Sequence, residues 1–151
     1  MSTRTLSTRS VGDEEKGFSL IELLFVVAII GIIAAIAIPG LSRARKNANA
    51  GSAVQSLRTI VTAEQIYEIK NKTYASLADL SGANLIDSNI ASGAKSGYNF
   101  TLTMSPDGKK FTCIATPQDQ PGVLNHFFVD ETGVIRSNTG APADATSQPI
   151  S

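Results

Sequence analysis

The sequence predicts an α+β protein in which a long N-terminal α-helix packs, through its second half, on a small antiparallel β-sheet. Three observations predict this fold class. An uninterrupted apolar run extends from Leu23 to Ile38, an amphipathic stretch follows it, and short segments with alternating apolar and polar residues begin at Tyr98. The 151 residues leave room for one globular domain with an appended segment, not for two domains.

Residues 1–17 form a polar leader without helical or strand periodicity. The leader carries Arg4, Arg9 and Lys16 and an acidic group at positions 13–15. A segment of this kind is typical of a disordered or targeting sequence.

The character of the chain changes at Phe18. Between Phe18 and Leu41 the only charged residue is Glu22. A helix over this range would be about 36 Å long at roughly 1.5 Å per residue, which is enough to cross a hydrocarbon core of about 30 Å. The β-branched residues of the run would also suit a strand, but strands of soluble proteins are much shorter. Residues 18–41 are therefore predicted as a transmembrane helix.

Residues 42–72 are predicted as the amphipathic second half of the same helix, ending near Asn71. Its apolar residues recur at helical spacing and include Ala53, Leu57, Ile60, Ala63 and Tyr67. Its charged residues include Arg58, Glu64, Glu68 and Lys70. One helix that is apolar all round at first and one-sided later is the expected result.

Residues 73–136 are predicted as a globular head. We expect a short helix or turn over 75–80 and a loop over the Ser/Gly/Ala-rich residues 88–96. Period-2 alternation predicts a strand at 98–104, and the segments between turn residues predict three more, at 111–116, 125–129 and 134–136. The successive hairpins indicate that these four strands are antiparallel. The apolar face of this sheet would cover the helix stripe, and residues 137–151 are expected to be a flexible tail.

Composition and charge argue against several function classes. Thirteen Lys and Arg balance thirteen Asp and Glu, so no basic excess indicates nucleic-acid binding. The single cysteine, Cys113, cannot form an intramolecular disulfide and is expected in a buried strand position, and the single histidine, His126, has no second histidine for a metal. Asp119, Asp130 and Glu131 are interpreted as turn residues rather than calcium ligands. We expect no catalytic residues, no metal, no cofactor and no nucleic-acid partner.

The residues alone leave two ordinary explanations of the apolar run. It could be the hydrophobic region of a secretory signal peptide cut near residues 35–37, where two alanines flank Ile36. It could also be a plain membrane anchor for an external domain. Three basic residues precede the run and three follow it closely, so the positive-inside rule does not set its orientation.

A third explanation rests on the string Lys16-Gly-Phe-Ser-Leu-Ile-Glu22 directly before the apolar run. This string resembles the class III signal of type IV prepilins and of the related type II secretion pseudopilins. The resemblance implies that residues 1–17 are a prepilin leader peptide. It implies cleavage between Gly17 and Phe18 by a prepilin peptidase, which also methylates the new N-terminal Phe18. The resemblance is close from Lys16 to about Pro39 and extends loosely to Arg136, which implies a pilin fold.

Glu22 would be the fifth residue of the mature chain, where the family places its acidic residue. A carboxylate in a membrane span costs roughly 2.5–3.5 kcal/mol at the bilayer centre and less near the interface. Pairing Glu22 of one subunit with the Phe18 amine of a neighbour would satisfy both groups during assembly. The alternative is that Glu22 simply reaches the lipid headgroups.

Gly31 and Pro39 weaken the apolar helix. Proline removes a backbone donor and glycine lowers helix propensity, so the segment between them is the easiest to unwind. The resemblance implies that this segment loses helicity when subunits pack into a filament. Alternatively, Gly31 is a packing residue in a straight helix and Pro39 a mild kink.

The resemblance implies a structural subunit of a type IV pilus-like filament rather than an enzyme. Its precursor would be a single-pass protein of the bacterial inner membrane. An assembly platform and ATPase would add it to a homo-oligomeric helical filament on the cell surface, which serves adhesion, twitching motility, DNA uptake or secretion. A major or minor pilin is favoured over a pseudopilin, because no stretch resembles the C-terminal calcium loop of the main secretion pseudopilin. The other alternative is a secreted or singly anchored binding domain that does not polymerise.

Overall fold

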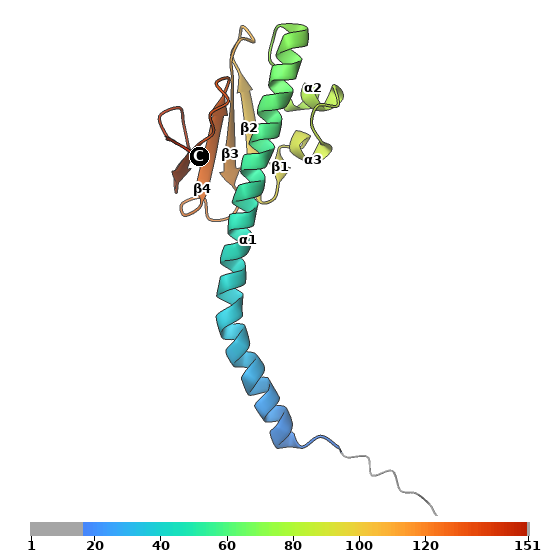
Figure 1. Cartoon of the computed structure of the whole chain (residues 1–151), viewed down its shortest axis with the longest axis vertical. Helices are drawn as coiled ribbons and strands as arrows, with labels where there is room; N and C mark the ends of the chain where they lie inside the picture. Colours follow the sequence, from blue (N-terminus) through green and yellow to red (C-terminus); the bar gives the residue numbers. More distant parts are fainter. Residues whose placement is uncertain (1–16, 151) are drawn as a thin grey trace, which may run out of the picture. The chain divides into compact units, whose positions relative to one another are not determined.

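A computed structural model describes residues 17–150, so the predicted leader lies outside the described residues except for Gly17. The described chain begins with one long helix, α1 (Leu20–Asn71) (Figure 1). The contacts within the chain divide the chain into two units, one up to Leu41 and one from Ser42 onward. We call the second unit the head.

In the first unit, α1 is apolar on all sides. Every large apolar side chain from Phe18 to Leu41 is at least 44% exposed. By length and composition, α1 is the one helix in residues 17–150 that could cross a membrane. Nothing within this unit buries its apolar surface.

In the head, α1 is one-sided, as the spacing of its apolar residues predicts. Leu57 and Ile60 are fully buried, and Tyr67 packs against the core from its edge. The helix ends at Asn71, as predicted. Lys72 takes a left-handed conformation (φ 64°) and donates its N–H to the Glu68 carbonyl at 2.7 Å, which closes the last turn.

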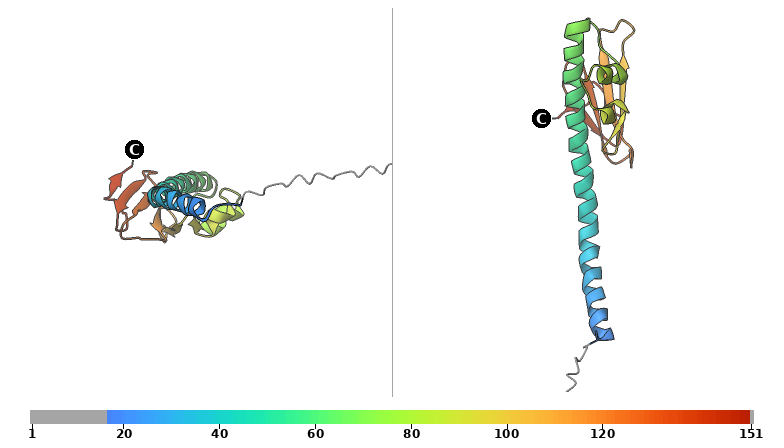
Figure 2. Two further views of the ribbon diagram at one scale, coloured as in Figure 1. Left: turned by 90° about the horizontal axis from the view of Figure 1, so that it is seen from below. Right: turned by 90° about the vertical axis from the view of Figure 1, so that its right-hand side faces the viewer.

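Six antiparallel strands follow in a simple meander, with the spatial order equal to the chain order. The second half of α1 lies along one face of this sheet (Figure 2). The strands are β1 (Ala94–Lys95), β2 (Tyr98–Met104), β3 (Phe111–Pro117), β4 (Asn125–Asp130), β5 (Arg136–Thr139) and β6 (Gln148–Pro149). The predicted α+β fold with a helix on an antiparallel sheet is therefore confirmed.

Alternation along β3 explains how the sheet meets the helix. Phe111, Cys113 and Ala115 point to the helix side and are buried, while the residues between them are half-exposed. Phe111 also makes an edge-to-face contact with Tyr74, with ring centroids 4.8 Å apart. Burying a side chain of this size contributes about 1.5–3 kcal/mol, so this strand carries much of the core.

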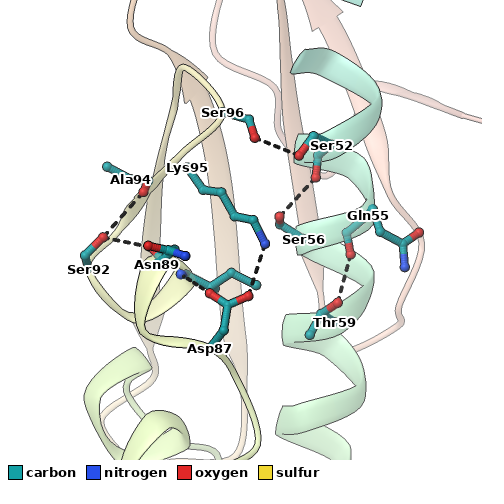
Figure 3. A network of polar contacts seen from close by, with 11 residues as sticks. Ser52, Gln55, Ser56, Thr59, Asp87, Asn89, Ser92, Ala94, Lys95 and Ser96 are labelled. Atoms are coloured by element: carbon teal, nitrogen blue, oxygen red, sulfur yellow. Dashed lines mark hydrogen bonds and ion pairs between the residues drawn. The ribbon is translucent and has the colours of Figure 1, made fainter. Parts of the chain in front are cut away.

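The connection between α1 and β2 is more ordered than predicted. The expected helix or turn over 75–80 is α2 (Leu77–Gly82), which Ser76 and Asp79 cap reciprocally. The expected loop over 88–96 instead contains α3 (Ser88–Ala91) and strand β1. Asp87 caps α3 by accepting the Ile90 N–H at 2.8 Å. The same carboxylate pairs with Lys95 of β1 at 3.1 Å (Figure 3).

The C-terminal segment also differs from the prediction. The fourth strand, expected at 134–136, lies at Arg136–Thr139 and pairs with β4. Within the expected flexible tail, β6 pairs with β5, and Ile150 donates its N–H to the Ile135 carbonyl at 2.9 Å and packs on the core. Backbone pairing to the edge of the sheet orders this polar segment.

Candidate assembly site on the N-terminal helix

The predicted cleavage and assembly residues lie at the start of α1. Gly17 and Phe18 precede the helix, and Phe18 is 83% exposed. The Leu23 N–H donates to the Ser19 carbonyl at 3.1 Å, which extends the helical hydrogen bonding back toward Phe18. Phe18 and Glu22 therefore lie about one helical turn apart along the chain.

Glu22 occupies the first turn of α1. The unpaired N–H groups of a helix N-terminus carry partial positive charge, so a carboxylate is favoured there. Within residues 17–150, Glu22 forms no ion pair. Its carboxylate is exposed beside an apolar surface and is accessible to a cation of another molecule.

Gly31 and Pro39 both lie within the continuous helix. Because Pro39 has no N–H, it cannot donate to the Ala35 carbonyl, which loses its helical partner. Apart from its own stretch of helix, a side-chain carbon at Gly31 would meet no atom of the described residues within 4 Å, so no such contact requires a glycine there. The segment between them keeps a helical backbone with one missing hydrogen bond.

The apolar half of α1 requires an apolar environment. An all-round apolar helix is not stable alone in water and is found among lipid chains or among other apolar helices. In such an environment, the carboxylate of Glu22 can form an ion pair with a cation. The helix therefore has the features of an insertion and packing element.

The head shows no group arranged for covalent chemistry in its described residues. Burial raises the pKa of the Cys113 thiol to about 12, which leaves it unreactive. The His126 ring is buried, and its Nε2 lies 2.8 Å from the Pro121 carbonyl. No group of three or more His, Cys, Asp or Glu in residues 17–150 could hold a metal ion.

Sequence reasoning missed Glu64, which is fully buried. Its Oε2 accepts the Ala75 N–H at 2.9 Å and so ties α1 to the segment before α2. Burial raises the pKa of Glu64 to about 7, and the hydrogen bond from Ala75 offsets part of this effect. The sequence feature that indicates burial of Glu64 is its position, one turn after Ile60 in the apolar stripe.

Comparison with known proteins decides the family. The prokaryotic N-terminal methylation motif matches residues 14–38. The chain is 35% identical over 136 residues to the type IV wide pilus major component PilA4 of Thermus thermophilus, covering 90% of this chain and 95% of that protein. This chain belongs to the type IV pilin and pseudopilin family.

Two further relatives show the breadth of the pilin family. Core protein G of the type II secretion system of Escherichia coli is 27% identical over 106 residues, or 68% of this chain and 73% of that protein. The type IV major pilin PilA of Myxococcus xanthus is 39% identical over 64 residues, or 42% of this chain and 29% of that protein. No solved structure matches the chain. The relatives are structural pilins and pseudopilins, not enzymes.

Proposed function

We propose that this pilin-family chain is a structural subunit of a helical type IV pilus-like filament. It would be made as a single-pass inner-membrane precursor, cut by a prepilin peptidase after Gly17 and methylated at Phe18. The observation that carries the proposal is the Gly17–Phe18 junction directly before a helix that is apolar on all sides and carries one carboxylate.

The apolar half of α1 would form the core of the filament, and the head, from Ser42 on, would lie outward. Within lipid, apolar helices associate by close packing at small residues, which Gly31 and the neighbouring Ala34 and Ala35 allow. Pairing of Glu22 with the Phe18 amine of a neighbour would satisfy two charges that the apolar core would otherwise strand.

The segment from Gly31 to Pro39 would unwind on assembly. It already lacks one helical hydrogen bond, and glycine gains the most backbone freedom when a helix opens. Partial unwinding would let neighbouring helices adjust their lengths in the core. An assembly platform and ATPase would supply the energy to extract the subunit from the membrane.

The first test is the N-terminus of the mature chain. N-terminal sequencing and mass spectrometry of filaments sheared from cells should show Phe18 with one added methyl group. Gly17→Leu should leave the leader attached and abolish filaments, whereas Ser19→Ala should not. A mature chain starting near Ile38, or the absence of filaments by electron microscopy, would instead support a secreted or singly anchored domain.

Among filament roles, a surface pilus is favoured over a secretion pseudopilus. The chain is 35% identical to PilA4 but only 27% identical to core protein G of Escherichia coli. Deletion of the gene should therefore remove surface filaments and the adhesion, twitching or DNA uptake that depends on them. Loss of protein secretion with filaments intact would support the pseudopilin alternative.

A further inference from the structure

The carboxylates of the head fall into two groups. In the first, the carboxylate serves local structure: Asp79 and Asp87 cap helices, Glu64 accepts the Ala75 N–H, and Asp107, Asp130 and Asp144 accept hydrogen bonds within turns. In the second, the side chain has no ion pair or hydrogen bond to any described residue. The acids of this second group are Glu68, Asp119 and Glu131.

Two cations gather in a pocket at the start of the head. The pocket has a volume of about 480 Å³, and Arg45 and Lys46 of α1 line it together with Asn49, Gln118 and Asp119. Lys46 Nζ donates to Gln120 Oε1 at 2.6 Å, which holds the ammonium group in place, whereas the Arg45 guanidinium has no partner among the described residues. We call this the basic pocket, since its two cations outnumber its one acid.

Two free acids gather elsewhere on the head. A side-chain carbon at Gly133 would lie 3.5 Å from Val61 Cγ1, so the turn that carries Glu131 lies against α1. Glu68 follows Val61 by two helical turns and lies on the same side of α1. Thr112 pairs with Asp130 in the sheet, so Glu131 lies beside Phe111, whose ring centroid is 4.8 Å from that of Tyr74. Burial raises the pKa of Tyr74, and the carboxylates of Glu68, Glu131 and Glu64 raise it further. We call Glu68 and Glu131 the acidic pair.

The separation of the two patches suits a translated copy of the same chain. Arg45 and Glu68 lie on one helix, roughly 35 Å apart along its axis at about 1.5 Å per residue. A filament of identical subunits is built from heterologous contacts, in which two different patches of one chain meet on successive copies. Opposite charge and an axial offset are the properties such patches need.

We propose that the basic pocket of one subunit binds the acidic pair of a second copy displaced along the fibre, with Arg45 as its main ligand. The inference rests on the proposed filament. A guanidinium can bind a carboxylate through two parallel hydrogen bonds, which fixes register as well as attraction. These head contacts would add to the packing of the apolar helices and set the axial position of each head.

The test is a charge swap in the full chain expressed in cells. Arg45→Glu and Glu131→Lys should each reduce sheared filament about tenfold relative to the subunit retained in the membrane, and the double variant should restore most of it. Arg58→Glu is the matched control, because it makes the same charge change at an exposed position of α1 outside both patches, where the arginine side chain has no partner among the described residues. Asp119→Asn, which removes the one acid of the pocket, should not reduce assembly.

A second measurement does not depend on the folding of charge-reversed chains. A chain carrying Arg45→Cys and Glu131→Cys should form disulfide-linked ladders in filaments, whereas either change alone, or Arg45→Cys with Arg58→Cys, should not. Cys113 is fully buried and would not compete.

The outcomes separate the two proposals. If wild-type filaments form, but the single charge variants assemble normally or the double variant and the cysteine pair show neither rescue nor ladders, the contact is wrong while the filament function stands. In particular, loss of filament with Arg45→Glu that no acidic-pair variant restores would assign the pocket to lipid headgroups. If the wild-type chain forms no filament, both proposals fail.

Discussion

Glu64 shows how a single buried carboxyl group can organise the head. It lies in the apolar stripe of α1 and holds the Ala75 N–H, while its other oxygen, Oε1, is buried without a hydrogen-bond partner among the described residues. An ionised carboxylate in this position would pay a desolvation cost with only one donor to offset it. The neutral acid is therefore the form that the fold prefers.

This preference predicts a pH dependence of stability. The pKa of Glu64 is about 7 in the folded head against an ordinary 4.5, so the folded state holds a proton that the unfolded state releases. The resulting contribution is fully present below about pH 4.5 and is lost as the pH rises through about 7, with a size on the order of 3 kcal/mol. Thermal unfolding of the detergent-solubilised chain at several pH values across this window should show the loss.

Glu64→Gln separates this group from all others that titrate. The amide still accepts the Ala75 N–H but cannot ionise, so the variant should lose less stability than the wild type across the same window. Glu68→Gln, at a half-exposed position of α1, is the control and should keep the wild-type slope. Equal slopes for Glu64→Gln and the wild type would show that Glu64 does not titrate there.

Two glycines of the head should respond oppositely to alanine. Gly97 has φ +75°, and an added Cβ would lie 3.2 Å from Asn49 Nδ2, so Gly97→Ala should lower the free energy of unfolding by about 1–2 kcal/mol. Gly51 lies within α1 with no atom within 4 Å of an added Cβ, so Gly51→Ala should raise it by up to about 1 kcal/mol. Denaturant unfolding of both variants in detergent checks the pair. Destabilisation of similar size in both would refute the conformational argument.

At the scale of elements, periodicity predicted those whose own residues carry the pattern. The helix end at Asn71 and the strands β2 and β3 agree with the apolar spacing, because these elements bury one face of their own side chains. Strand β4 was predicted from its apolar residues rather than from alternation, and it buries four consecutive residues, from His126 to Val129. Strand β5 is Arg-Ser-Asn-Thr and shows no such pattern. It is a strand because β4 offers an unpaired edge to its backbone, which local composition does not encode.

The candidate site was predictable for a different reason. Phe18, Glu22, Gly31 and Pro39 stand out because each breaks the uniformity of an apolar run or marks its start. Their proposed roles depend on contacts with other subunits, which a single chain does not contain. The burial of Glu64 was not predicted, because a charged residue in an amphipathic helix usually lies on the solvent side. Only the fold shows which side of α1 faces the solvent.

The unwinding proposed for α1 makes a prediction about that element alone. Pro39→Ala restores a donor for the Ala35 carbonyl and should strengthen the helix locally by up to about 3 kcal/mol. If assembly requires this segment to unwind, filament yield should fall while the amount of subunit in the membrane is unchanged. Gly31→Ala should act in the same direction, whereas Gly40→Ala, just outside the segment, is the matched control. Normal filaments from Pro39→Ala and Gly31→Ala would show that the segment can stay helical.

At the scale of the whole molecule, the two units have opposite requirements. The head buries its own core and leaves polar residues at its surface, whereas the first unit buries none of its large apolar side chains. The first unit therefore needs an apolar environment, which lipid or, in the proposed filament, other copies of α1 would supply. The formal net charge of zero conceals this, because the only charge between Phe18 and Leu41 is that of Glu22.

Assembly of the whole molecule should therefore depend on the charge of Glu22. In a filament core, the Phe18 amine of a neighbour would be left unpaired if Glu22 were neutral, which costs about 3–5 kcal/mol when one member of a buried pair is removed. Glu22→Gln and Glu22→Ala should each reduce filament at least about tenfold, measured as sheared protein relative to subunit in the membrane, while Glu22→Asp should retain part of the yield. The near-isosteric Gln variant separates charge from shape, because it keeps the size and shape of the side chain and removes its charge. If Glu22→Gln assembled as the wild type does, the carboxylate would only be favoured by the helix N-terminus, and the register of the subunits would have to come from the heads.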